Sequence, residues 1–64
     1  MSNAEAKEII EKIGIKRQVA AMKSMIHPTT FSGWLNNTKD LTPEQLQRVT
    51  KYLEHMKGAV LESD

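Results

Sequence analysis

The chain has 64 residues, no cysteine and a formal net charge of +1 at pH 7. This length corresponds to one small domain that buries little surface, which favours association between copies. Without cysteine there are no disulfides or thiolate zinc sites, and two histidines cannot hold zinc alone, so we expect no metal and no cofactor. The sequence contains no run of about 18 apolar residues that could span a membrane. No apolar signal segment follows Met1, which favours the cytoplasm.

The first predicted helix spans residues 3–13. Ser2 and Glu5 fit a capping box, in which their side chains satisfy backbone N–H groups at the helix start. Four apolar residues then fall on one helical face: Ala6, Ile9, Ile10 and Ile13. Gly14 follows where a left-handed C-cap is expected, so the helix should end there.

Two short helices are predicted next, over residues 16–24 and 28–35. In the first, large apolar residues recur at the spacing of one helical face: Ile15, Val19, Met22 and Ile26. Between the helices, Pro28 disfavours the α conformation at His27 but suits the first turn of a new helix. In the second, the apolar stripe consists of Phe31, Trp34 and Leu35. We expect this stripe in the core, with polar side chains on the opposite face.

The last predicted helix starts at a second capping box, formed by Thr42 and Gln45. Its buried face is predicted to consist of Leu46, Val49, Leu53 and Met56. Gly58 is the predicted stop, so that residues 1–58 form the domain and residues 59–64 a C-terminal tail. Because no segment alternates like a strand, we predict a compact all-α fold of four to five helices.

The two short helices lie in a segment that contains no acidic residue. All eight acids come before Lys12 or after Lys39, so both ends of the chain are net acidic. The five basic residues of the segment are Lys12, Lys16, Arg17, Lys23 and Lys39. Two adjacent helices in a basic, acid-free segment match the electrostatic character of a DNA-binding surface.

Residues 15–57 resemble the Cro/cI-type (XRE-like) helix-turn-helix family. Ala21 matches an alanine in the first motif helix, and Met25 and Ile26 match the turn. Phe31 and Trp34 match two buried positions of the recognition helix, and Asn37 matches the residue that closes it. His27 stands where the family has the cap of the recognition helix. The resemblance implies a lambda-repressor-like helix-turn-helix domain with residues 28–35 as the recognition helix.

Two residues depart from the family pattern. Met25 occupies the position of a glycine that permits a left-handed turn, and Ala20 precedes Ala21 where the family has a larger residue. An alternative alignment places Val19 and Ala20 on the pair of a large residue and alanine, and adds one residue to the turn. Phe31 keeps its position in both alignments, so both imply the same recognition helix.

The resemblance also implies that the chain binds double-stranded DNA as a homodimer, with the recognition helix in the major groove. The candidate DNA-binding residues on this helix and at its cap are His27, Pro28, Thr29, Thr30, Ser32, Gly33 and Asn36. The candidate phosphate contacts are Lys16, Arg17, Gln18, Lys23 and Lys39. Asn36 is suited to pair with adenine. Long polar side chains are scarce on this helix, which leaves part of the specificity to DNA shape.

We therefore expect a sequence-specific transcriptional regulator, similar to the Cro-like repressors of bacteriophages and mobile elements, at the nucleoid of a bacterial host cell. The alternative is a helix-turn-helix scaffold that binds protein, as an antirepressor or as an inhibitor of another regulator or host protein. Gly33 and the lack of arginine in residues 28–35 favour this alternative. A further alternative is the DNA-binding end of a longer repressor. We do not expect an enzyme, because no nucleophile–base arrangement and no phosphate-binding glycine loop occurs.

Overall fold

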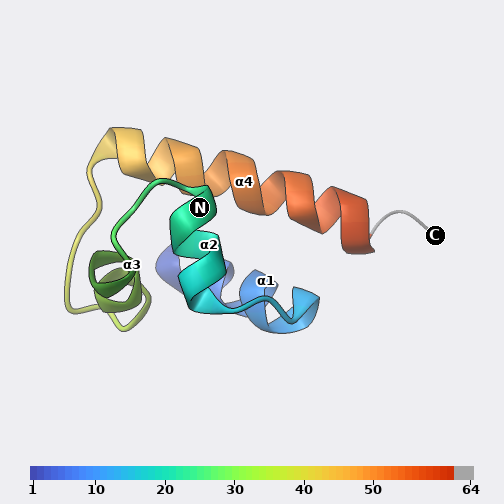
Figure 1. The fold of residues 1–64 in the computed structure, drawn as a ribbon, viewed down its shortest axis with the longest axis horizontal. Helices are drawn as coiled ribbons and strands as arrows, with labels where there is room; N and C mark the ends of the chain where they lie inside the picture. Colours follow the sequence, from blue (N-terminus) through green and yellow to red (C-terminus); the bar gives the residue numbers. More distant parts are fainter. Residues whose placement is uncertain (62–64) are drawn as a thin grey trace.

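Four helices form the fold of residues 1–61, the part of the chain that the computed structural model describes (Figure 1). They are α1 (Asn3–Ile13), α2 (Arg17–Lys23), α3 (Pro28–Leu35) and α4 (Pro43–Leu61). The predicted all-α fold is confirmed, with four helices in this part of the chain. The Cα radius of gyration is 10.9 Å, close to the roughly 10.7 Å expected for a compact chain of this length.

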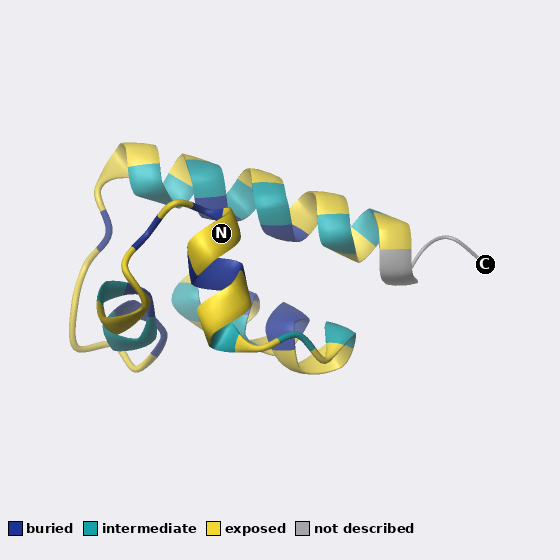
Figure 2. Ribbon diagram, viewed as in Figure 1, coloured by how far each residue is buried: buried dark blue, intermediate teal, exposed yellow. Residues whose placement is uncertain are grey.

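The long helix α4 lies across α1 and α2, and α3 packs against both of these shorter helices (Figure 1). Phe31 and Trp34 of α3 lie in the core with ring centroids 5.9 Å apart, as the apolar stripe predicts. Of the four residues predicted to be buried on α4, Val49 and Leu53 are fully buried, whereas Leu46 and Met56 are half-buried. Figure 2 shows that burial on α4 is concentrated where the other helices lie beneath it.

Local capping sets the ends of α1 and the start of α4: the serine half of the predicted capping box is found at α1, and both halves are found at α4. The Ser2 hydroxyl accepts a hydrogen bond from the Glu5 N–H with an O–N distance of 3.1 Å, and Gly14 ends α1 with a φ of 81°. At the start of α4, the Gln45 N–H donates to the Thr42 hydroxyl, and the Gln45 side-chain oxygen accepts from the Thr42 N–H. Each bond joins residues three apart, which is why sequence alone revealed them.

The buried face of α2 differs from the predicted one. Val19 and Met22 were expected in the core, but they are 40% and 65% exposed, whereas Ala20 and Ala21 are fully buried. The physical reason is the length and position of α2, a helix of seven residues that packs against both α3 and α4. Alanine side chains allow this close approach, and Val19 and Met22 then point away from the core.

The turn between α2 and α3 has the hydrogen bonds of a Schellman motif. The Ile26 N–H donates to the Ala21 carbonyl with an N–O distance of 2.9 Å, and the Met25 N–H donates to the Met22 carbonyl with an N–O distance of 3.1 Å. Met25 lies in the left-handed region with a φ of 56°. Met25 therefore adopts a left-handed conformation although it is not a glycine.

The predicted stop at Gly58 is wrong, because α4 continues through this residue to Leu61. Glycine in a helix costs only about 1 kcal/mol relative to alanine, so a helix that is anchored elsewhere can pass through it. Residues 59–61, which we assigned to a C-terminal tail, therefore belong to α4, and residues 62–64 lie outside the described part of the chain. None of the helices between residues 1 and 61 has the length and apolar character that a membrane crossing requires.

Candidate nucleic-acid interface

The helix α3 has one buried face and one polar face. Phe31, Trp34 and Leu35 are buried in the core. The predicted base-contacting residues divide by exposure, with His27, Pro28, Thr29 and Asn36 exposed, and Thr30, Ser32 and Gly33 half-buried. The polar face therefore consists of short, uncharged side chains.

His27 caps α3 through its side chain. Its Nδ1 accepts a hydrogen bond from the Thr29 N–H, with an N–N distance of 3.2 Å. Its backbone is extended, with φ −60° and ψ 134°, as the following Pro28 requires. The capping role that the resemblance implies for His27 is thus present, and the ring remains exposed at the start of the polar face.

Arg17 reaches from the start of α2 to the end of α3. Its Nη1 donates to the Asn36 Oδ1 with an N–O distance of 3.4 Å. Arg17, a predicted phosphate contact, therefore lies beside Asn36, the predicted base-reading residue. Lys16 and Gln18 flank Arg17 and are both exposed.

Lys39 lies over Gly33, in the middle of the polar face. The loop after α3 folds back, so that the Thr38 N–H and the Lys39 N–H both donate to the Gly33 carbonyl, with N–O distances of 2.8 and 3.2 Å. A Cβ added at Gly33 would lie 2.9 Å from Cγ and Cδ of Lys39. Glycine at this position therefore leaves room for the lysine stem, and a cation is brought onto an otherwise uncharged helix.

Lys23 lies apart from this group. It is six residues after Arg17, so the two side chains leave α2 in directions more than 90° apart. Lys23 instead lines a hollow with Arg48 and Lys51 of α4. The predicted cations therefore divide between two surfaces, with Arg17 and Lys39 at α3 and Lys23 against α4.

Three cations of these two surfaces come before α4 in the sequence. They are not neutralised within the described part of the chain. The ion pairs found between residues 1 and 61 are Lys12–Glu8 and Arg48–Glu44, each within one helix. Arg17, Lys23 and Lys39 form none of them. Their positive charges are thus available to an external anion.

Two contacts that sequence reasoning missed hold the helices in place. Asn3 Nδ2 donates to the Trp34 carbonyl of α3 with an N–O distance of 3.1 Å. Arg48 Nε donates to the Ser24 carbonyl at the end of α2, with an N–O distance of 2.9 Å. The partners are 31 and 24 residues apart, so no local pattern signals either contact.

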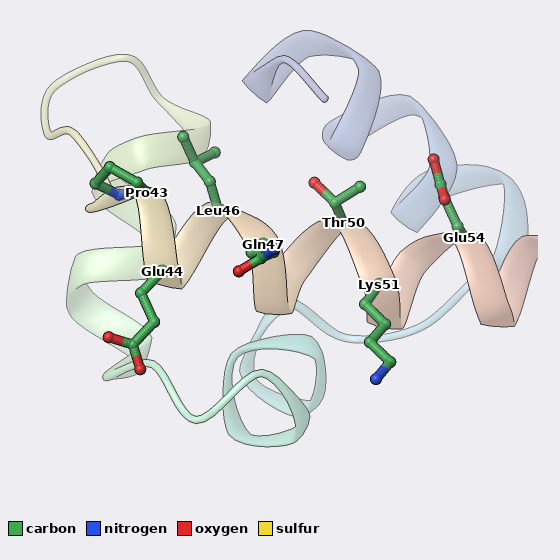
Figure 3. A pocket seen from close by; sticks show the side chains of 7 residues that line it. All are labelled: Pro43, Glu44, Leu46, Gln47, Thr50, Lys51 and Glu54. Atoms are coloured by element: carbon green, nitrogen blue, oxygen red, sulfur yellow. The ribbon is translucent and has the colours of Figure 1, made fainter.

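A shallow depression also lies along α4. It follows one side of α4, has a volume of about 590 Å³, and is lined by Pro43, Glu44, Leu46, Gln47, Thr50, Lys51 and Glu54. The Thr50 and Lys51 side chains point in different directions rather than toward a common point (Figure 3). Between residues 1 and 61, no three metal-binding side chains come together either.

Comparisons with protein-family models, with curated proteins and with solved structures gave no match for this chain. The features of this chain that indicate a function are the polar face of α3 and the two cations that border it, Arg17 and Lys39.

Proposed function

We propose that this chain is a sequence-specific DNA-binding transcriptional regulator of the Cro/repressor type, acting in the bacterial cytoplasm. In this proposal α2 and α3 form a helix-turn-helix, and α3 is the recognition helix. The observation that carries the proposal is the combination at α3 of an exposed polar face with Arg17 at its end and Lys39 across its middle. No acid occurs between Lys12 and Lys39 to repel a phosphate.

The turn before α3 supports the same assignment. Met25 is the residue that aligns with the turn glycine of the helix-turn-helix family, and its φ of 56° is one that glycine adopts readily. Ile26, which follows it, is buried against the core. The backbone at this turn thus has the geometry that the first of the two alignments requires.

In the proposed complex, α3 enters the major groove and Asn36 reads a base edge. The Arg17 side chain holds the Asn36 oxygen, so the amide group is oriented before DNA binds. Lys16, Arg17 and Lys39 contact phosphates and set the position of the helix on the duplex. The polar side chains of α3 are short, so DNA shape supplies the rest of the specificity.

A homodimer would place two copies of α3 in successive major grooves, about 34 Å apart, and would select a two-fold symmetric operator. The first test is selection of the purified chain against random duplex DNA, followed by sequencing of the bound pool. Enrichment of a symmetric motif with half-sites about one helical turn apart would support the proposal. A pool without any motif, or no bound pool, would refute sequence-specific recognition.

The second test is charge reversal at the site. Replacing both Arg17 and Lys39 by Glu is expected to abolish binding to the selected duplex, and the helical circular dichroism should be retained because neither residue belongs to the buried core. The matched control is Lys57→Glu, an exposed charge reversal on α4, which should leave the affinity nearly unchanged. For a milder variant, Lys39→Gln, the slope of log K against log salt should fall by about 0.9 if Lys39 neutralises one phosphate. An unchanged affinity in the double variant would contradict the assignment.

A further inference from the structure

A second basic surface lies where the end of α2 and the turn after it meet the middle of α4. It is a shallow hollow of about 500 Å³, lined by Lys23, Met25, Arg48, Lys51, Tyr52 and His55. We call these six residues the basic hollow. Three of them are cations and none is an acid, and among them only Arg48 is paired within the described residues, to Glu44.

Met25 forms the apolar border of the basic hollow, and two more exposed apolar side chains lie on α2. Between residues 1 and 59, the large apolar side chains that are exposed are Val19, Met22 and Met25, at 40%, 65% and 74%. All three belong to α2 or to the turn that follows it, and Met25 also lines the hollow. Methionine adapts its shape to different partners and is frequent in surfaces that bind amphipathic helices.

The hollow is held in shape by Arg48. Its Nε donates to the Ser24 carbonyl and its Nη2 to the Met25 carbonyl, with N–O distances of 2.9 and 3.4 Å. These two bonds tie the turn to α4, so the surface is formed before any partner arrives. A preformed surface loses less conformational entropy on binding than a mobile one.

We propose that the basic hollow and the exposed face of α2 bind an acidic amphipathic helix of a different protein. Its carboxylates would pair with Lys23 and Lys51, and its apolar side chains would cover Met22 and Met25. The charge of the hollow and the apolar border together define this partner. The proposal does not rest on DNA binding, because it involves a surface on the α4 side of α2.

A second copy of this chain fits the surface poorly. A two-fold symmetric contact through the basic hollow would bring Lys23 and Lys51 of both copies together, which is electrostatically unfavourable. Within residues 1–59, the large exposed apolar side chains of a second copy lie in this same segment, at Val19, Met22 and Met25. DNA phosphates would complement the lysines but would leave the methionines in water. A separate acidic and apolar protein segment satisfies both requirements.

The test uses the full chain labelled with ¹⁵N and a synthetic helical peptide with leucines on one face and glutamates on the other. Amide shifts are expected at Lys23, Met25 and Lys51, and a matched peptide with glutamine in place of every glutamate should bind much more weakly. Lys51→Glu should weaken binding about tenfold, whereas Lys57→Glu on the same helix should change it less than about twofold. Met22→Ser, at an exposed site, should weaken binding about fivefold.

Three outcomes would overturn the proposal. The first is the absence of amide shifts at millimolar peptide, and the second is a set of shifts that lies elsewhere on the molecule. The third concerns the duplex selected by this chain: if Lys51→Glu weakens its binding as strongly as the Arg17 and Lys39 substitutions do, the hollow is a phosphate contact. Failure of the DNA selection itself would leave the peptide measurements unaffected, so the two proposals can fail separately.

Discussion

Replacing Met25 by glycine is expected to stabilise this domain, although glycine usually destabilises a folded chain. Met25 has a φ of 56° in the turn between α2 and α3. An L-residue in the left-handed region costs about 1–2 kcal/mol. Glycine avoids this strain but loses about 0.5–1 kcal/mol more chain entropy on folding. The Met25 side chain is 74% exposed, so little apolar burial is lost.

At the middle of each range, the difference is a gain of about 0.75 kcal/mol in the free energy of unfolding, or about 3–6 °C in Tm for a domain of this size. Urea titration followed by circular dichroism at 222 nm would measure it. The matched control is Met22→Gly, the same change inside α2, which should cost about 1 kcal/mol. Opposite signs for the two variants are the expected result. If both variants lose stability by similar amounts, the left-handed conformation assigned to Met25 is wrong.

Two further substitutions test features that the structure added. Ser24→Ala should raise the free energy of unfolding by about 1 kcal/mol, because the Ser24 hydroxyl is buried, at 1% exposure, and has no hydrogen-bond partner; a loss of stability in the same urea titration would mean that a bound water satisfies this group. Gly58→Ala should add about 0.5–1 kcal/mol and some helical circular dichroism, because α4 continues through Gly58 and an added Cβ would meet no atom within 4 Å. A loss of stability on this substitution would instead indicate that the helix ends at Gly58.

The ends of the helices could be predicted from the sequence wherever the capping contacts join residues close together in the chain. Ser2 with Glu5, and Thr42 with Gln45, each form hydrogen bonds across three residues. Gly14 ends α1 because only a residue tolerant of the left-handed region fits there. Gly58 shows the limit of this reasoning. The same residue type ends one helix and lies inside another, because the anchoring of α4 upstream outweighs the small local cost.

The orientation of α2 was decided by its neighbours. Spacing alone favoured a stripe of large residues that included Val19 and Met22, but α3 and α4 approach the alanine side of the helix. The spacing of large apolar residues does not show that the small side chains of Ala20 and Ala21 allow two helices to pack closely. For the same reason, spacing did not indicate that Val19 and Met22 form an exposed apolar face on α2.

The sequence by itself determined the all-α class, the capped helix ends, the buried stripe of α3 and the acid-free segment that suggested DNA. Each of these depends on residues a few positions apart, or on composition. Only the tertiary structure decided which cations share a surface: Arg17 meets Asn36, Lys39 covers Gly33, and Lys23 joins Arg48 across 25 positions of the sequence. Such groupings depend on the packing of whole helices against one another, and that packing follows from the total buried surface rather than from any local pattern.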